Sequence, residues 1–232
     1  MELDTNQSNR NTRNRILNQY FRRTQRWLWV GLILTLGMLC LALLLANLRM
    51  RTIKPLPVLG TVSEFRLTNQ LSQPISLNDL RGHVWVADII FTRCAGPCLT
   101  MSRHMKELQG ALPPSSNTRL ISLTTDPRFD VPPVLEQYAQ RFKADPKRWM
   151  FLTGTQQEIA NVASNSLRLA AVEKLPEERE SAVDLFIHST IFVVVDKKGQ
   201  LRGIFETTGE GINAGQVKAE ILSAVHQLER ER

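Results

Sequence analysis

The chain has 232 residues, 43% of them hydrophobic, and is long enough to bury a sizeable core in one or two domains. Seven arginines against two carboxylates in the first 50 residues supply most of the formal net charge of +7, whereas proteins that bind nucleic acid usually carry their basic charge on the folded domain. Nucleic acid is therefore excluded as the expected partner, and three cysteines are too few for a disulfide scaffold.

The chain begins with residues 1–26, which are polar, rich in Asn, Gln and Arg, and predict a basic cytoplasmic tail. Residues 27–48 then form a run of 22 residues without a charge. A helix of that length would reach about 33 Å, enough to cross a hydrocarbon core of about 30 Å. No small-x-small cleavage site follows Ala46, so the run predicts an uncleaved single-pass anchor, with Cys40 inside it.

Arginines are more numerous before the apolar run than basic residues are after it. The positive-inside rule therefore predicts a protein of the inner (plasma) membrane with a cytoplasmic N-terminus and a periplasmic or otherwise extracytoplasmic C-terminal domain. Residues 49–61 contain two prolines and predict a linker, and residues 62–232 form the predicted domain.

Within this domain, strand-like and helix-like patterns alternate along the chain, which predicts a single domain of the α/β class. The expected elements, in chain order, are a hairpin with arms at 65–67 and 75–77, a central buried strand at 83–90, a helix from about 98 to 112, a strand at 120–123, a helix at 132–142, a strand at 149–152, a helix at 155–167, an exposed loop at 173–182, a strand at 189–195 with a hairpin partner at 201–205, and a helix at 214–228.

Cys94 and Cys98 lie where the central strand is expected to end and the next helix to begin. Because Pro97 is tolerated at a helix start, Cys98 is expected in the first turn and Cys94 in the preceding loop. Such a pair can form a disulfide or present two sulfurs to one metal ion. The helix dipole favours thiolate over thiol, so we expect a reactive or metal-competent pair, with two buried structural thiols as the alternative.

A metal bound by this pair would need a third ligand, and periodicity alone does not choose one among His83, His104, His188 and His226. Two thiolates with one imidazole suit Cu(I). Structural zinc normally takes four protein ligands, and the sequence has no second Cys or His pair with finger-like spacing.

Asp88 is the single carboxylate of the central strand and precedes Cys94 by six residues. A buried carboxylate tends to have a raised pKa, which suits a general base that moves protons for the cysteine pair. A carboxylate hydrogen-bonded to nearby backbone is the alternative. Met101 and Met105 are soft enough to bind copper, but they share a helix stripe with Leu108, which predicts core packing.

Four passages resemble the Sco/SenC family in the same order. Phe91–Cys98 resembles its Phe-Thr-x-Cys-x-x-x-Cys-Pro motif, and residues 122–130, with Asp126 and Asp130, resemble its Ser-Val-Asp-Pro-x-x-Asp segment, although turn capping explains these two carboxylates equally well. Residues 135–154 are similar to its next helix and strand, and residues 188–191 to its Asp-His-Ser/Thr segment. The resemblance extends from about residue 62 to the end of the chain.

The resemblance implies a thioredoxin-like fold, with a central mixed sheet flanked by helices, tethered by one membrane helix. It also implies that Cys94, Cys98 and His188 bind a copper ion, Cu(I) or Cu(II). Members of the family deliver copper to, or keep reduced the cysteines of, the dinuclear copper site of cytochrome c oxidase. The partners this implies are the oxidase subunit that carries the site and other copper chaperones or thiol–disulfide proteins.

Two departures from the family pattern keep a second hypothesis open. Leu99 stands where the family has proline, and Pro97 precedes the second cysteine, an order closer to the Gly-Pro-Cys of thioredoxins. Ile187 replaces the acidic residue before the histidine, which removes one partner that could orient it. The alternative is a thiol–disulfide oxidoreductase in which Cys94 attacks and Cys98 resolves. A redox sensor without turnover is a third possibility.

Overall fold

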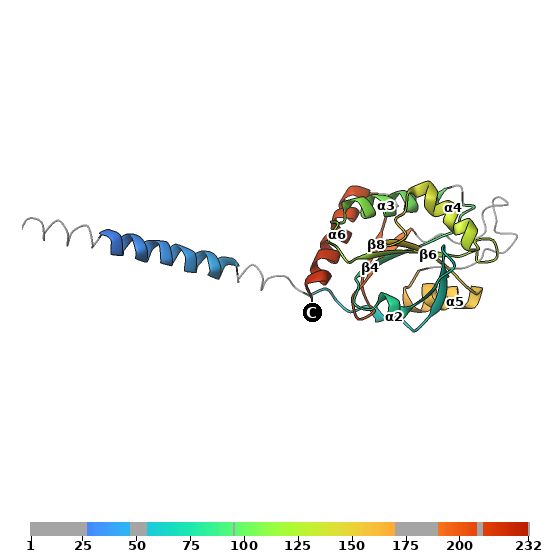
Figure 1. Cartoon of the computed structure of the whole chain (residues 1–232), viewed down its shortest axis with the longest axis horizontal. Coiled ribbons are helices and arrows are strands. Elements are labelled where there is room, and N and C mark those ends of the chain that lie inside the picture. The colour runs from blue at the N-terminus through green and yellow to red at the C-terminus, as the bar shows by residue number, and fades with distance from the viewer. Residues whose placement is uncertain (1–26, 47–54, 95, 170–189, 208–210, 232) are drawn as a thin grey trace, which may run out of the picture. The chain divides into compact units, whose positions relative to one another are not determined.

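The computed structural model describes residues 27–46, 55–94, 96–169, 190–207 and 211–231, which fall into two compact units, 1–55 and 56–232. In the first unit, Trp27–Ala46 form a single helix of 20 residues, blue in Figure 1, with a mean hydropathy of 2.6. It confirms the helix predicted within residues 27–48. A helix of this length reaches about 30 Å, and one such helix near an N-terminus is typical of a membrane anchor or a signal sequence. The predicted tail at residues 1–26 lies outside the described residues.

An eight-stranded mixed sheet forms the centre of the second unit, and its strand order is β1-β8-β7-β4-β5-β6-β2-β3. The pairs β4–β5 and β5–β6 are parallel and all other pairs are antiparallel. The strands are β1 (Gly60–Thr61), β2 (Arg66–Asn69), β3 (Pro74–Ser76), β4 (Trp85–Ile90), β5 (Arg119–Thr124), β6 (Trp149–Thr153), β7 (Ile191–Val195) and β8 (Gln200–Glu206). The prediction of a mixed sheet with a buried central strand is confirmed.

Helices cover both faces of the sheet (Figure 1). One face carries α3 (Pro97–Ala111), α4 (Pro132–Phe142) and α6 (Ala214–Arg230), and the other carries α2 (Leu77–Leu80), α5 (Gln156–Ala160) and the π-helix η1 (Asn161–Ser166). Two separate apolar clusters fill these two layers. All six residues of β4 are buried because side chains alternate between the layers, which explains why the strand is nearly continuous in apolar residues.

Several helix starts are where the sequence signals predict them. Pro132 is the first residue of α4. Thr155 caps α5 by accepting a hydrogen bond from the Glu158 amide, and the Glu158 carboxylate accepts one from the Thr155 amide. Asn213 caps α6. The stretch 155–167 is helical as predicted, but its second half, η1, has π-helical geometry that the sequence did not indicate.

Residues 56–61 of the predicted linker belong to the second unit. Gly60–Thr61 form β1, which pairs with the start of β8, and the Leu59 amide donates to the Leu201 carbonyl at 2.8 Å. Arg202 donates to the Leu56 carbonyl at 2.7 Å. The structure therefore places residues 56–61 within the folded unit, ahead of the boundary expected at residue 62. The loop predicted at 173–182 lies outside the described residues.

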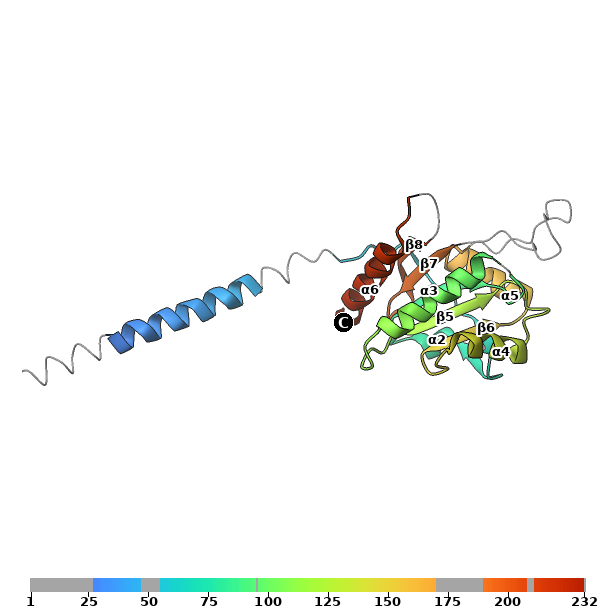
Figure 2. The same cartoon turned by 90° about the horizontal axis from the view of Figure 1, so that it is seen from above.

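Strand directions separate the start of the folded unit from the loop that follows β4 (Figure 2). The chain joins the sheet beside the amino end of β8. β4 is antiparallel to β7 and β7 is antiparallel to β8, so β4 and β8 run in the same direction. The carboxyl end of β4 therefore lies at the opposite strand end of the sheet from the amino end of β8. The loop that follows β4 is therefore at the end of the strands remote from residues 56–61, where the chain enters the second unit.

Candidate functional site

The cysteine pair lies at the junction of β4 and α3. The Cys94 amide donates to the Phe91 carbonyl at 3.2 Å, which turns the chain out of the strand. Pro97 is the first residue of α3 and Cys98 the second, so the predicted placement of the two cysteines is confirmed. Cys94 and Cys98 are only 5% and 4% exposed, whereas Gly96 and Pro97 between them are exposed. In this reduced pair the two thiols are hydrogen-bonded to each other.

The hydrogen bond with Cys94 raises the pKa of the Cys98 thiol well above its ordinary value, and burial raises it further. The expectation that the helix dipole would favour a thiolate is therefore wrong for Cys98. A helix N-terminus stabilises a thiolate only modestly, whereas removing the sulfur from water penalises its ionised form more strongly. The reduced pair keeps the Cys98 proton until a metal ion or a disulfide bond replaces it.

Asp88 lies in the middle of β4 and is fully buried. Its Oδ1 accepts a hydrogen bond from Ser122 Oγ at 2.6 Å, while its Oδ2 has no hydrogen-bond partner among the described residues. Burial raises the pKa of Asp88 to about 7. The predicted burial and raised pKa are confirmed. Hydrogen bonds with Ser122 and with the Asp88 backbone lower the pKa by less than burial raises it, and the role of Asp88 as a general base stays a prediction.

A small polar network surrounds Asp88 on the α3 side of the sheet. Ser122 is the register partner of Asp88 on β5, and it accepts from Trp149 Nε1 at 3.0 Å. Ser102 on α3 and Tyr138 on α4 form a second buried hydrogen bond of 3.0 Å. Burial, together with the charges of the cysteines and Asp88, raises the pKa of Tyr138. The sequence analysis missed these residues, although Ser122 is a polar residue in an otherwise apolar strand and could have been noticed.

A second loop, residues 124–131, holds the cysteine loop in place. The buried Asp130 carboxylate accepts hydrogen bonds from the Thr92 amide at 3.0 Å and from the hydroxyl groups of Thr92 and Thr124. Arg93 forms an ion pair of 2.5 Å with Asp126. Asp130 therefore links the two loops directly. Turn capping, which the sequence analysis gave as an equally good explanation of this residue, does not account for that link.

The predicted third ligand, His188, lies outside the described residues. Within the described residues, no cluster of three or more His, Cys, Asp or Glu side chains is arranged to hold a metal ion. His83 Nδ1 is 2.9 Å from the Asn117 carbonyl, at the amino end of β4, and His226 is near the C-terminal end of α6. Neither of these two histidines is at the edge of the sheet that carries the cysteine pair.

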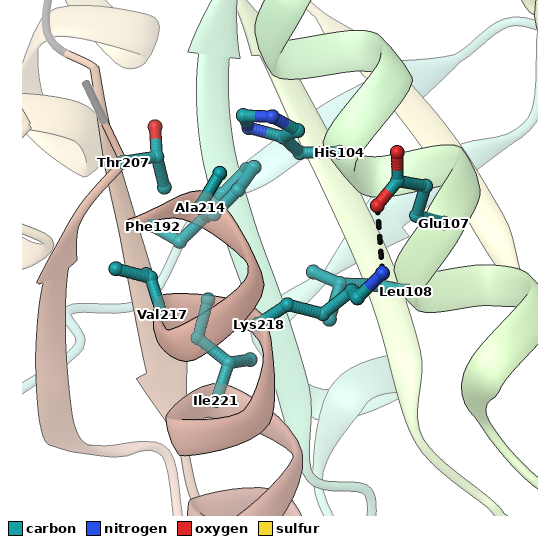
Figure 3. A pocket seen from close by; sticks show the side chains of 9 residues that line it. All are labelled: His104, Glu107, Leu108, Phe192, Thr207, Ala214, Val217, Lys218 and Ile221. Carbon is teal, nitrogen blue, oxygen red and sulfur yellow. Dashed lines mark hydrogen bonds and ion pairs between the residues drawn. The ribbon is translucent and has the colours of Figure 1, made fainter. Parts of the chain in front are cut away.

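His104 is on α3 but faces a small hollow between α3 and α6 (Figure 3). An ion pair of 2.8 Å between Glu107 and Lys218 crosses the space between these helices, and the rest of the lining is largely apolar. Neither cysteine lines this hollow, so it is separate from the thiol site. Met101 and Met105 are 1% and 0% exposed in the core cluster, which confirms that they pack in the core.

Comparison with known proteins is consistent across sequence and structure. The model of the SCO1/SenC family matches residues 57–225. A SCO1 protein homolog of Bacillus subtilis is 36% identical over 147 residues, which are 62% of this chain and 73% of that protein. The solved structure of BsSco, described as a member of the Sco family of cytochrome c oxidase assembly proteins with a disulfide switch, is 31% identical. It superposes with a TM-score of 0.61 over 75% of this chain and 98% of its own.

The structure of Bradyrhizobium japonicum ScoI with copper bound is 22% identical, with a TM-score of 0.56, and covers 71% of this chain and 99% of its own. At that identity the likeness concerns the fold. The thioredoxin-like Sco fold predicted from the sequence is therefore confirmed.

Proposed function

Because the chain belongs to the SCO1/SenC family, we propose that it binds copper through Cys94, Cys98 and His188. We further propose that it delivers copper to, or reduces the cysteines of, the dinuclear copper site of cytochrome c oxidase. The observation that carries this proposal is the buried pair of mutually hydrogen-bonded thiols at the start of α3. Two thiolates in such contact form a soft donor set suited to Cu(I).

The chemistry of the pair supports a metal-binding role. Copper binding requires both sulfurs as thiolates, so the metal must displace the proton that Cys98 holds through its hydrogen bond with Cys94. Burial excludes water from the sulfurs, and removing the metal would again leave a buried pair that shares one hydrogen bond. The site would therefore alternate between a protonated and a metal-bound form of the same two sulfurs.

The position of Thr190 supports His188 as the third ligand. The Thr207 amide donates to the Thr190 carbonyl at 2.8 Å, and Thr207 Oγ1 is 3.0 Å from Met101 Sδ, one turn of α3 beyond Cys98. Two residues span at most about 7 Å, so a side chain two positions before Thr190 is within reach of this edge of the sheet.

The test is a competition for Cu(I) between a chelator and the reduced full-length chain in detergent. We expect one tight site per chain, loss of that site in Cys94→Ser, and weaker binding in His188→Ala. His104→Ala is the matched control, because His104 lies on α3 yet faces the separate hollow. Absence of a one-to-one site, or equal affinity in His188→Ala and the native chain, would contradict the proposal.

The alternative function is thiol–disulfide exchange. It is favoured by Asp88 Oδ2, which has no hydrogen-bond partner among the described residues. In this reaction the Cys94 thiolate attacks one sulfur of a client disulfide, and the other client sulfur leaves as a thiolate. Cys98, deprotonated by Asp88, then attacks the Cys94 sulfur and releases the client. Two electrons and two protons pass to the client, and the chain keeps a Cys94–Cys98 disulfide.

The two functions respond differently to the same pair of substitutions. Disulfide exchange predicts that Asp88→Asn slows reduction of a small disulfide while His188→Ala leaves the rate unchanged. If Asp88→Asn exchanges at the native rate, Asp88 is not the base of this reaction. If His188→Ala instead removes Cu(I) binding, the copper function is the one supported.

We also propose that Trp27–Ala46 is a retained anchor that holds the domain on the extracytoplasmic side of the inner membrane. The apolar helix of 20 residues and the arginines before it support this assignment. Alkaline extraction of membranes and protease digestion of spheroplasts test it. The domain should stay in the membrane pellet and be degraded only from outside. Recovery of a soluble chain that lacks the helix would indicate a cleaved signal sequence instead.

A further inference from the structure

Two large apolar side chains are exposed on one short turn beside the cysteine pair. Phe129 and Val131 are each 43% exposed. Among the described residues of the second unit, the other exposed large apolar side chains, Val58, Leu71 and Ile204, belong to separate parts of the chain. Exposed apolar residues that occur singly need no explanation, whereas a grouped pair beside a reactive site indicates a binding surface.

The turn that presents them is firmly held. The amides of Phe129 and Asp130 donate to the Asp126 carbonyl at 3.0 and 2.8 Å, and the Val131 amide donates to the Phe129 carbonyl at 2.8 Å. The Asp130 carboxylate is fixed by Thr92. Such a turn loses little conformational freedom when it contacts a partner, so the exposed side chains are preorganised for binding.

Arg93 connects this turn to the thiols. It directly precedes Cys94, and its guanidinium carbon is 4.3 Å from the centre of the Phe129 ring while the group also pairs with Asp126. Phe129 is thus within one side-chain length of the cysteine loop. Gly96 and Pro97, which directly precede Cys98, are exposed. A polypeptide that contacts the cysteine loop therefore lies next to the turn.

The surface carries one positive charge that no carboxylate matches among the described residues. Arg93 and Arg128 are both exposed, but Arg93 pairs with Asp126 at 2.5 Å, whereas Arg128 donates only to the neutral Gln156 at 3.2 Å. A partner segment that fits this surface carries an apolar side chain for Phe129 and carboxylates that can pair with Arg128.

We propose that Arg93, Arg128, Phe129 and Val131 form a docking ridge for a cysteine-bearing client segment with an apolar side chain and carboxylates beside its cysteines. The proposal rests on the proposed function, because it concerns the client of the same thiols. The ridge acts on binding of the client, and the sulfur chemistry remains with Cys94 and Cys98.

The test compares three disulfides reduced by the full-length chain in detergent. The first is a disulfide-bonded peptide with leucine and glutamates beside its cysteines, the second is the same peptide with serine and lysines, and the third is uncharged 2-hydroxyethyl disulfide. In each reaction the chain's two thiols are oxidised to a disulfide and the probe disulfide is reduced to two thiols. We expect the native chain to reduce the acidic apolar peptide faster than the basic one.

Phe129→Ser should lower the rate constant for the acidic apolar peptide about tenfold, the loss expected for one central apolar contact, and leave 2-hydroxyethyl disulfide unaffected. Arg128→Glu should reverse the preference between the two peptides. Leu71→Ser is the matched control, because Leu71 is also 43% exposed but lies between β2 and β3.

Equal slowing of all three disulfides by Phe129→Ser, or an equal loss in Leu71→Ser, would overturn the docking ridge. A native chain that reduces both peptides equally while still binding Cu(I) would contradict the ridge alone. A native chain that neither binds Cu(I) nor reduces 2-hydroxyethyl disulfide would contradict the proposed function itself. These outcomes separate the two proposals.

Discussion

At the scale of single residues, Asp88 is the least expected side chain of the core. It is a fully buried carboxyl group in the central strand, with one hydrogen bond from Ser122 and one oxygen without a partner among the described residues. Such a group is tolerated in a core when it is neutral, since burying an unpaired carboxylate is far more costly. The folded protein therefore holds a proton on Asp88 up to a pKa of about 7.

This raised pKa predicts how stability depends on pH. Between the ordinary pKa of 3.8 and about 7, the folded chain keeps a proton on Asp88 that the unfolded chain has lost. The contribution of Asp88 to the free energy of unfolding is therefore largest below pH 4, falls as pH rises to about 7, and is constant above it. The total fall is about 4 kcal/mol at most. Asp88→Asn should remove this dependence, which urea unfolding of the reduced protein at pH 4 to 7.5 would measure.

Glu136→Gln on the exposed side of α4 is the control for this experiment, because it removes a carboxyl group that is not buried. The native chain and Glu136→Gln should show the same pH dependence. If Asp88→Asn also keeps the native pH dependence, Asp88 does not carry a raised pKa in the folded protein.

The sequence located Cys94, Cys98 and Asp88 because each departs from the apolar pattern around it. It could not identify Ser122 or Tyr138 as their neighbours, because strand register and helix packing decide which residues of β5 and α4 face Asp88. It also misjudged the Cys98 thiol, whose pKa is set by burial and by the Cys94 hydrogen bond. Neither effect is visible in local sequence.

At the scale of elements, two loops from neighbouring strands hold the site together. The loop after β4 carries the cysteines, and the loop after β5 carries Asp130, whose carboxylate accepts the Thr92 amide. Parallel strands bring their carboxyl ends to one edge of the sheet, so these loops meet there. The geometry of the thiol pair thus depends on a residue on a different loop.

Asp130→Ala should lower the free energy of unfolding by about 3 kcal/mol, because it leaves the Thr92 amide and two hydroxyl groups without their acceptor. Alkylation of the reduced cysteines should become faster, since the loop that buries them is released. Urea unfolding and the rate of iodoacetamide modification measure the two effects.

Asp126→Ala is the comparison, since it removes only the ion pair with Arg93, whose side chain is 41% exposed. A surface pair of this kind contributes about 0–1 kcal/mol. Equal destabilisation by the two substitutions would show that Asp130 is not the link between the loops.

Most elements could be predicted because their periodicity and end signals agree, as in β4, α4 and α6. The two-residue strand β1 could not, because it is too short to show alternation and forms only by pairing with β8. The π-helical half of the stretch 155–167 could not either, since its apolar pattern is compatible with an ordinary α-helix. His188 remains a prediction from the family resemblance.

At the scale of the whole domain, residues 56–61 and the thiol site are at opposite strand ends of the sheet. Residues 56–61 join at the amino end of β8, together with the C-terminal end of α6. The cysteine loop is at the carboxyl end of β4. The length of the central strands thus separates the thiol site from residues 56–61.

Arg202 holds this end of the domain together. This residue is 7% exposed, and it pairs with Asp196 at 2.7 Å, with Glu231 at 2.9 Å, and with the Leu56 carbonyl. One guanidinium group therefore ties the start of the unit to its last helix. Because both carboxylates and the carbonyl depend on it, its removal leaves polar atoms without a partner in a partly buried place.

Arg202→Met should lower the free energy of unfolding by about 3–5 kcal/mol, the range for breaking a buried ion pair from one side. The Cu(I) affinity of the folded protein should not change, because Arg202 and the thiols are at opposite strand ends of the sheet. Arg81→Met is the control. Arg81 forms an ion pair with Glu64, and their side chains are 44% and 69% exposed, so this pair should contribute about 1 kcal/mol or less to the free energy of unfolding. Weaker Cu(I) binding in folded Arg202→Met would mean that the two strand ends of the sheet are coupled, and that the residues around Arg202 can influence the thiol site across the sheet.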